Sequence, residues 1–199
     1  MEKLVNKPKT KRGEATLNRL VKSAEKHFYK KGYHGTSIHD ITSQANVAPG
    51  TFYIYFEDKM SLYRYLLTQY SYKIRKHIAL SIADVKSRKE AEKIGLRAFL
   101  EFIKDNKHIY NIIWESLYID PTLFVDYYTK FAQIYTTQII KAQEDNQMKV
   151  YNPEVVSFVL MGISNFIGLN WVMFKGDKNF DEVVEEVIEI LEKGLFVDE

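Results

Sequence analysis

The stretch "NVAPGTFYIYFEDK", residues 46–59, places Pro49 and Gly50 side by side and then packs four aromatic residues into five positions. Pro49 suits the first turn of a helix, because the amide that proline lacks has no partner there. A short helix beginning near Pro49 has too many aromatic residues for one buried face. Phe52 and Phe56 fit a core, whereas Thr51, Tyr53, Ile54 and Tyr55 are spread around the rest of the helix. We therefore ask what the hydroxyl groups of residues 51, 53 and 55 contact.

The sequence before this stretch predicts two further helices. Apolar residues recur at helical spacing from about residue 14 to residue 31, and Gly32 supplies a positive-φ helix end. Thr36 or Ser37 can cap a second, short helix that has Ile38, Ile41 and Ala45 on its inner face. Asn46 can adopt the positive φ that a tight turn requires. A long helix followed by two short helices around a tight turn is typical of a helix-turn-helix unit.

The rest of the chain also reads as helices. Capping residues and periodicity predict six more, and no alternating strand pattern is sustained. Their expected ranges are about 58–83, 87–106, 108–118, 121–146, 153–174 and 179–195. The fold class is therefore all-α with nine helices.

Composition and charge narrow the class of protein. The first 60 residues hold eleven Lys or Arg against six Asp or Glu, a net charge of +5, and since the whole chain is +2 the remaining 139 residues carry −3. A basic first third suggests a module that binds a polyanion, although a solvated lysine-rich helix has the same bias. The chain contains no cysteine, and its basic N-terminus has no apolar segment typical of a secretory signal, so we expect a cytoplasmic protein.

Residues 32–63, "GYHGTSIHDITSQANVAPGTFYIYFEDKMSLY", resemble the DNA-binding segment of TetR-type (TetR/AcrR) transcriptional regulators. The resemblance rests on the Gly-Tyr pair at 32–33, Thr36, "DI" at 40–41, "GTFY" at 50–53, "YF" at 55–56 and Lys59. It implies a nine-helix TetR-like fold that works as a two-fold dimer. Residues 1–57 would form the DNA-binding domain, with a basic arm at 1–13, and residues 58–199 would bind an effector and dimerise.

The resemblance also implies roles for individual residues on double-stranded operator DNA. Thr36, Tyr53 and Lys59 would hold phosphates, and Tyr55 occupies a position that touches phosphate. Thr51, with Ala48, Pro49 and Gly50, would lie against base edges or the sugar backbone, and Ile54 would meet a thymine methyl group. Ala48 replaces the usual Ser or Thr cap of this helix, which costs about 1 kcal/mol of helix stability. Two alternatives stay open: Tyr53 and Tyr55 are core residues, or the basic arm (Lys7, Lys9, Lys11, Arg12) is a solubilising tail.

The last two predicted helices are candidates for the homodimer interface. Residues 153–174 are apolar on all sides and include the small residues Gly162, Ser164 and Gly168, which let two backbones approach closely. The alternative for this segment is a membrane span, which its Ser157, Ser164, Asn165 and Asn170 disfavour. The apolar stripe of residues 179–195 suits a helix-helix seam.

Aromatic residues dominate the middle of the chain and fit either a solid core or an apolar pocket. The resemblance implies a pocket for a small effector, and we expect it to be lined by Phe102, Trp114, Tyr118, Tyr127, Phe131 and Phe166. Glu115 is the main charge expected there, with Arg97 or His108 as further candidates. This composition favours a small hydrophobic or lipophilic cationic effector, such as a fatty-acyl compound or an aromatic drug. Ligand binding would move the fourth helix and change the spacing of two recognition helices.

Two other classes of protein, an enzyme and a helical adaptor, are less consistent with the sequence. The five histidines have no metal-site spacing, and no phosphate loop or catalytic triad can be assembled, so we expect no enzyme activity, metal or cofactor. A helical adaptor that binds another protein explains the bundle but leaves the charge asymmetry and the Tyr/Thr/Lys pattern without a cause. The favoured reading is a ligand-responsive regulator, by family habit a repressor, that is released from a palindromic operator by its effector.

Overall fold

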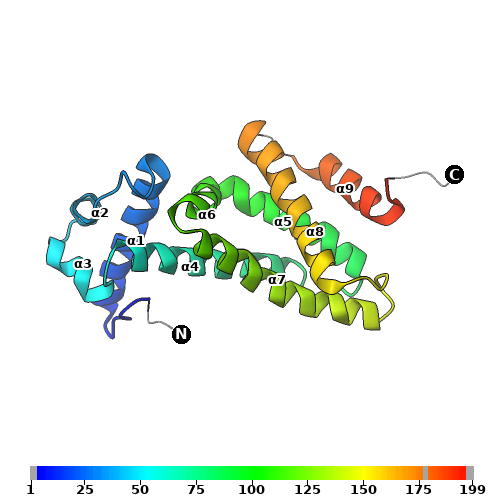
Figure 1. Cartoon of the computed structure of the whole chain (residues 1–199), viewed down its shortest axis with the longest axis horizontal. Helices are drawn as coiled ribbons and strands as arrows, with labels where there is room; N and C mark the ends of the chain where they lie inside the picture. The colour runs from blue at the N-terminus through cyan, green and yellow to red at the C-terminus, as the bar shows by residue number, and fades with distance from the viewer. Residues whose placement is uncertain (1–3, 177–178, 196–199) are drawn as a thin grey trace. The chain divides into compact units, whose positions relative to one another are not determined.

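The computed structural model describes residues 4–176 and 179–195, and over these residues the chain is helical with no strand. The helices are α1 (Lys11–Lys31), α2 (Ile38–Gln44), α3 (Pro49–Tyr55), α4 (Lys59–Ser81), α5 (Arg88–Asp105), α6 (Lys107–Ile119), α7 (Pro121–Glu144), α8 (Pro153–Ile167), η1 (Gly168–Phe174) and α9 (Asp181–Lys193). Figure 1 shows their order along the chain. The prediction of an all-α fold with nine helices is confirmed, with α8 continuing into the π-helical turn η1 at its end.

Helix ends are set by the capping residues that the sequence offers. Asp58 accepts a hydrogen bond from the amide of Ser61 at the start of α4, and Asn152 accepts from the amides of Glu154 and Val155 at the start of α8. Asn46 has a φ of 52°, as its place in the turn between α2 and α3 predicted. The predicted start of α1 at residue 14 is wrong by three residues, because Thr10 caps the helix by accepting from the amide of Gly13.

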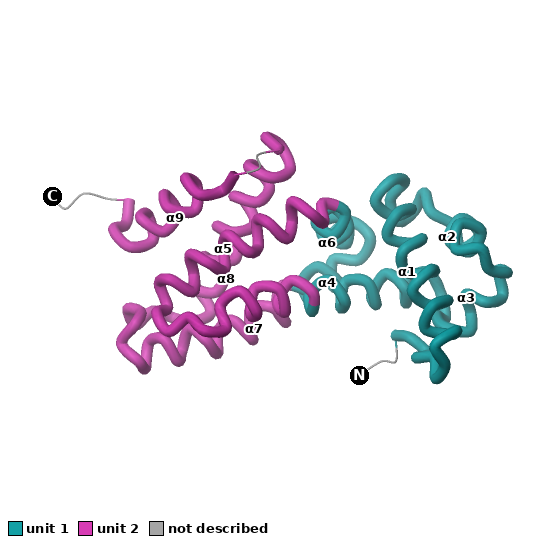
Figure 2. Tube along the Cα trace, turned by 180° about the vertical axis from the view of Figure 1, so that it is seen from behind, with its two compact units in different colours: residues 1–72, 108–127 teal, residues 73–107, 128–199 magenta. Residues whose placement is uncertain are grey.

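The chain divides into two compact units, which Figure 2 colours separately. Unit 1 contains residues 1–72 and 108–127, and unit 2 contains residues 73–107 and 128–199. Unit 1 thus holds α1–α3 together with the first part of α4, α6 and the start of α7. The functional boundary expected at residues 57 and 58 remains a prediction, since packing groups α6 with the N-terminal helices.

The core of unit 1 fixes the geometry of its three N-terminal helices. α2 packs against α1 and α3, and the side chains of Ile41 and Phe52 are fully buried between them. The Ser23 hydroxyl on α1 donates to the Ile41 carbonyl at 2.8 Å. Full burial of one such apolar side chain contributes about 1.5–3 kcal/mol, so α3 is held firmly by its inner face.

In unit 2, α5 packs against α8, η1 and α9. Four residues of α9 form its buried face: Val183, Val184, Val187 and Ile188. Three ion pairs also join α5 to α9: Lys89 with Glu192, Lys93 with Glu185, and Arg97 with Asp181. Arg97, expected as a candidate pocket charge, is therefore paired with α9.

The helix formed by α8 and η1, Pro153–Phe174, is the one described helix that is long and apolar enough to cross a membrane by length and composition. A core or interface helix of a protein that spans no membrane meets the same criterion. Several of its apolar side chains are exposed in the single chain: Val155, Phe158, Val159, Phe166 and Phe174. Exposed apolar residues on one helix are a common feature of contact surfaces.

Candidate nucleic-acid interface

The outer face of α3 is the most exposed aromatic and apolar surface of the N-terminal helices. Tyr53 is 56% exposed and Ile54 is 62% exposed, whereas Phe52 between α2 and α3 is fully buried. Thr51 is half-buried, and Ala48, Pro49 and Gly50 lie exposed at the start of the helix. Six of the nine residues expected to meet DNA therefore share one outward surface.

The start of α3 is open to close approach. A Cβ atom built on Gly50 would meet nothing within 4 Å, and Ala48 makes no side-chain cap to the helix. The absence of a cap at Ala48 was predicted from the sequence. Pro49 has no amide hydrogen and the Thr51 amide donates to the Ala48 carbonyl at 2.9 Å, so this helix start offers few amides to a phosphate oxygen.

Tyr55 lies inside the unit, contrary to the phosphate contact expected of it. Its side chain is 7% exposed, and its hydroxyl donates to the Gly13 carbonyl at 3.2 Å. The alternative that Tyr55 is a core residue is therefore the correct one, and Tyr53 is the exposed member of the pair. Helical geometry explains the difference, because residues 52, 55 and 56 follow the three- and four-residue spacing of one buried face.

Thr36 is also buried, which contradicts its expected place on the phosphate-binding surface. The side chain is 1% exposed, and its hydroxyl donates to the Gly32 carbonyl at 2.7 Å. Ser37 is the residue that caps α2, with the reciprocal hydrogen bonds of a capping box between Ser37 and Asp40. Thr36 thus supports the loop before α2 rather than presenting a hydroxyl to a ligand.

Lys59 is partly buried and binds the same loop. Its ammonium group donates to the carbonyls of Tyr33 at 2.7 Å and Thr36 at 2.6 Å, and it lies 4.2 Å from the Tyr33 ring centroid. Burial lowers the pKa of Lys59, while the charge of Glu115 acts in the opposite direction. With two of its three N–H donors committed to backbone carbonyls, Lys59 retains one donor for a phosphate.

Glu115 lies in unit 1, where its Oε1 atom accepts a hydrogen bond from the Tyr33 amide at 2.7 Å. The expectation that this carboxylate faces an effector pocket is wrong, because the α1–α2 loop holds it. His108 contacts the rings of Tyr29 and Tyr70 in the same unit. The argument for a cationic effector rested on Glu115 and loses its support.

The six residues expected to line an effector pocket are divided between the two units. Trp114, Tyr118 and Tyr127 belong to unit 1, and Phe102, Phe131 and Phe166 belong to unit 2. Trp114 contacts the rings of Tyr110 and Phe124, and Phe102 contacts the ring of His77. Tyr118 is 84% exposed and Phe166 is 64% exposed, so these two do not line an enclosed cavity within their own units.

Aromatic residues also hold unit 1 together. The rings of Phe28, Tyr33 and Tyr63 contact one another, with centroids 5.2 to 5.8 Å apart. The Tyr63 hydroxyl donates to the Ile112 carbonyl of α6 at 2.6 Å, and burial raises the pKa of this tyrosine. Helical periodicity alone gives no sign of this tyrosine bond between α4 and α6.

The fold and this surface define a helix-turn-helix protein in which one short helix, α3, exposes its outer face to solvent. The comparisons with known proteins agree: residues 20–66 match the sequence model of the family described as "Bacterial regulatory proteins, tetR family". This match identifies residues 20–66 as a DNA-binding domain of the TetR family of helix-turn-helix transcriptional regulators. The predicted basic arm at residues 1–13 precedes the match, and its residues 1–3 lie outside the described residues.

Curated relatives are similar over nearly the whole chain. The Transposon Tn10 TetC protein of Escherichia coli is 27% identical over 192 residues, which cover 92% of this chain and 88% of that protein. The HTH-type transcriptional activator FasR of Mycolicibacterium smegmatis is 19% identical over 177 residues, which cover 88% of this chain and 81% of FasR.

Solved structures share the fold at low sequence identity. The fatty acid degradation regulator FadR from Bacillus halodurans superposes with a TM-score of 0.80 at 17% identity, covering 95% of this chain and 98% of that chain. FadR from Bacillus subtilis, in complex with stearoyl-CoA, superposes with a TM-score of 0.74 at 17% identity, and the match covers 90% of this chain and 100% of the FadR chain. AibR, in complex with isovaleryl coenzyme A and operator DNA, superposes with a TM-score of 0.69 at 14% identity, and the match covers 88% of this chain and 97% of the AibR chain.

Proposed function

We propose that the chain is a dimeric repressor that binds a palindromic operator through α3 and is released by a small hydrophobic effector. The observation that carries the proposal is the two-sided character of α3: Phe52 is fully buried, and Tyr53 and Ile54 are more than half exposed. An anchored helix with an exposed outer face has the properties of a recognition helix in the major groove. DNA contacts are assigned to Ala48, Pro49, Gly50, Thr51, Tyr53 and Ile54, with Lys59 in a phosphate-facing role.

The dimer is assigned to α8 and α9 in unit 2. One half-site gives weak binding, so a palindrome requires two recognition helices related by a two-fold axis. The exposed apolar residues of α8, together with Ile190 and Leu191 of α9, supply an apolar surface for a second copy. This assignment would account for the apolar length of Pro153–Phe174 without a membrane span. We also propose a cytoplasmic location, where the operator DNA would be.

The effector is proposed to be an acyl compound, with an acyl-coenzyme A thioester as the leading candidate. Support comes from the fold neighbours described with stearoyl-CoA and isovaleryl coenzyme A, and from the aromatic and aliphatic composition of α5–α8. The commitment of Glu115 to the Tyr33 amide removes the reason to prefer a cation. Binding of the effector would lower the affinity for the operator, and binding of the operator would lower the affinity for the effector by the same factor.

The test of DNA binding is selection of bound duplexes from a random library by the purified protein. We expect an enriched palindrome with the wild type and with Tyr151→Ala, and none with Tyr53→Ala. Tyr151 is a matched control because it is 61% exposed, against 56% for Tyr53, and lies in the loop before α8. If both variants still select the palindrome, Tyr53 does not read DNA. If the wild type selects no duplex, a protein-binding adaptor is favoured instead.

The test of the effector uses the selected operator. A series of acyl-coenzyme A thioesters, free fatty acids and a lipophilic quaternary ammonium dye is added to the complex, and release is followed by fluorescence anisotropy. The proposal expects release by acyl compounds with an optimum chain length. Release by the dye alone would overturn the acyl assignment while leaving the regulator assignment intact.

A further inference from the structure

The inward face of α5 changes from polar to apolar along the helix. Leu96, Phe99 and Ile103 are buried on this face, and the same three- and four-residue spacing continues back through Glu92 to Arg88. The side chains of Arg88 and Glu92 are 13% and 17% exposed, so both lie largely inside unit 2. The first turns of α5 therefore place an ion pair where the rest of the helix places apolar side chains.

Helix α7 supplies a third member of this polar cluster. Tyr135 lies on the same face of α7 as the buried Ile139 and Ala142. Its hydroxyl donates a hydrogen bond to Oε2 of Glu92, and the Cζ atom of the Arg88 guanidinium lies over its ring, 5.3 Å from the centroid. Burial raises the pKa of Tyr135, and the charge of Glu92 raises it further. The hydroxyl therefore stays protonated and remains a donor to Glu92.

The guanidinium of Arg88 keeps a hydrogen-bond donor that the cluster does not use. Its Nη2 atom donates to Oε1 of Glu92 across one helical turn, so both oxygens of Glu92 are occupied. The Nε atom of Arg88 is buried and has no hydrogen-bond partner among the described residues. A buried N–H group without an acceptor is costly, so this atom favours a ligand that brings an acceptor oxygen to it.

The net charge of the cluster limits which acceptor it favours. Arg88 and Glu92 carry opposite formal charges and the Tyr135 hydroxyl is neutral, so the cluster sums to zero. A carboxylate brought to the Nε atom would lose its water and would lie near the charge of Glu92. The carbonyl oxygen of an ester, a thioester or an amide brings no charge. A neutral carbonyl therefore matches the unused donor better than a carboxylate does.

The cluster lies where the inward face of α5 reaches the surface. Arg88 is the first residue of α5, and its amide donates an exposed hydrogen bond to Oε1 of Gln147, in the turn after α7, at 2.7 Å. From Glu92 the face runs to Ile103 about 16 Å further along the helix axis. These ends of α5 and α7 both belong to unit 2, coloured magenta in Figure 2. The arrangement matches a molecule with an alkyl chain along the apolar face and a carbonyl group at Arg88.

We propose that Arg88 is the polar contact of the effector site and binds a neutral carbonyl oxygen, so that the protein responds to acyl thioesters, esters or amides rather than to free fatty acids. This inference rests on the proposed function and deepens it, because it accepts acyl-coenzyme A thioesters and rejects fatty-acid carboxylates. Arg88 donates to the effector, Glu92 cancels the charge of Arg88, and Tyr135 fixes Glu92 in place.

The test measures the affinity of the full chain, without DNA, for ligands that share one alkyl chain. The ligands are decanoate, methyl decanoate, decanamide and decanoyl-coenzyme A, and equilibrium dialysis at concentrations below micelle formation gives each dissociation constant. We expect the wild type to bind the three neutral carbonyl compounds and to bind decanoate about tenfold more weakly or worse.

Two variants separate the donor from the charge, and urea unfolding checks that each is folded. Arg88→Lys keeps a cation beside Glu92 but lacks the planar Nε donor, so the preference for neutral carbonyls should disappear. Glu92→Gln keeps an acceptor for Tyr135 and leaves the charge of Arg88 unbalanced, so decanoate should become the preferred ligand. The matched control is Glu189→Gln, which also leaves a cation unpaired across one helical turn. That cation, Lys193, is 68% exposed on α9 and its partner is 61% exposed, so the control should keep the wild-type preference.

Equal affinity of the wild type for decanoate and for the neutral ligands would overturn the inference and leave the acyl assignment intact. A preference that survives in Arg88→Lys, or that is the same in Glu92→Gln and Glu189→Gln, would also overturn it, since the cluster would then not contact the ligand. Binding of none of the ligands would reject the inference together with the acyl assignment. Because the assay contains no DNA, failure to select an operator would reject the proposed function without changing this result.

Discussion

The Oε1 atom of Glu115 on α6 lies 2.7 Å from the backbone nitrogen of Tyr33, which donates a hydrogen bond to it. The carbonyl of the same Tyr33 accepts a hydrogen bond from the Lys59 ammonium at 2.7 Å. Side chains from α6 and α4 thus hold both backbone polar groups of one residue in the loop between α1 and α2. That loop sets where α2 begins, and α2 in turn carries α3.

Glu115→Ala is expected to loosen this loop. A hydrogen bond to a charged group contributes about 1.5–3 kcal/mol, and the partial exposure of this one places it near the lower end. Hydrogen exchange at the Tyr33 amide should speed up, and urea should unfold the variant at a lower concentration than the wild type. Glu115→Gln keeps an acceptor oxygen and should recover part of the loss. Unchanged exchange at Tyr33 in the alanine variant would show that the bond contributes nothing.

Gly32→Ala is expected to be destabilising through two separable effects. Gly32 has a φ of +71°, which costs a residue with a Cβ about 1–2 kcal/mol, and the added Cβ would lie 2.7 Å from Glu115 Oε1. The carboxylate must then move and lose its bond to Tyr33. In a Glu115→Ala background only the backbone strain remains, so Gly32→Ala should cost less there. Equal costs in the two backgrounds, measured by urea unfolding, would contradict this coupling.

The fold followed from local signals in the sequence, because capping residues and helical spacing act over a few positions. Asp58 and Asn152 cap the helices that follow them, and Asn46 adopts a positive φ in the turn, as their residue types predict. The start of α1 was missed because the prediction relied on apolar spacing, which begins at Leu17, and passed over the polar cap at Thr10.

The candidate site was harder to predict, because burial within a short helix depends on partners distant in sequence. Tyr53 and Tyr55 are alike in sequence terms, but only Tyr55 finds an acceptor inside the unit, 42 residues away at Gly13. Glu115 likewise meets a backbone amide 82 residues away, which no local pattern encodes. The resemblance predicted that Thr36 binds phosphate, but its hydroxyl donates a hydrogen bond to the Gly32 carbonyl.

The ion pairs between α5 and α9 are expected to contribute a small stabilisation that depends on salt. Lys93 and Glu185 are 2.5 Å apart with side chains 29% and 60% exposed, and exposed pairs of this kind contribute about 0–1 kcal/mol. Glu185→Lys should lower the urea midpoint at low salt and lower it less in 0.5 M salt, roughly, where screening is short-ranged. Adding Lys93→Glu should restore the midpoint. A loss that salt leaves unchanged would point to packing.

Asp40 is expected to make part of the stability of unit 1 sensitive to acid. Its hydrogen bonds from Ser37, with a further contribution from Lys31, hold the pKa of Asp40 well below its usual range. A depressed folded-state pKa gives stability that is present above the unfolded value and is lost as pH falls through the folded value. The difference in urea midpoint between wild type and Asp40→Asn should be largest near pH 7 and shrink below about pH 4. A difference independent of pH would assign the effect to neutral capping alone.

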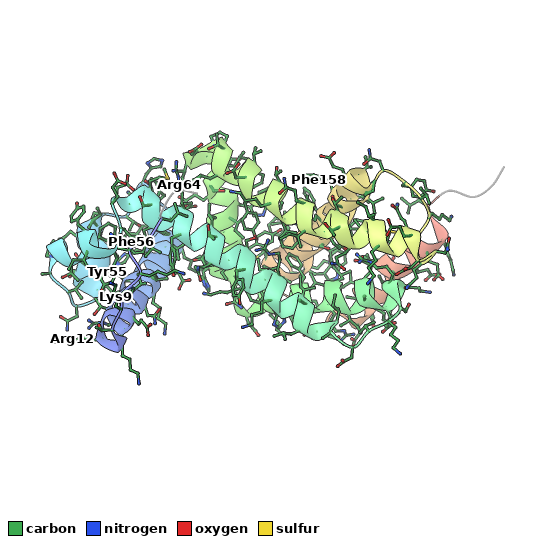
Figure 3. The ribbon with its side chains drawn as sticks, turned by 90° about the horizontal axis from the view of Figure 1, so that it is seen from below. Lys9, Arg12, Tyr55, Phe56, Arg64 and Phe158 are labelled. Carbon is green, nitrogen blue, oxygen red and sulfur yellow. The ribbon has the colours of Figure 1, made fainter. Side chains whose placement is uncertain are left out.

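The proposed dimer surface makes a prediction for Phe158, which is 45% exposed on α8 and is labelled in Figure 3. Phe158→Glu would place an unpaired carboxylate in an apolar interface at a cost of several kcal/mol. Since each 1.4 kcal/mol changes a dissociation constant tenfold, the dimer should weaken by about 100-fold or more. Sedimentation should show the variant as a monomer at concentrations where the wild type is a dimer, and its operator affinity should fall because one half-site then binds alone. Leu80→Glu, at a residue 68% exposed on α4, is the matched control and should leave the dimer intact. A Phe158→Glu variant that dimerises like the wild type would exclude this face of α8, and a monomeric wild type would exclude the dimer itself.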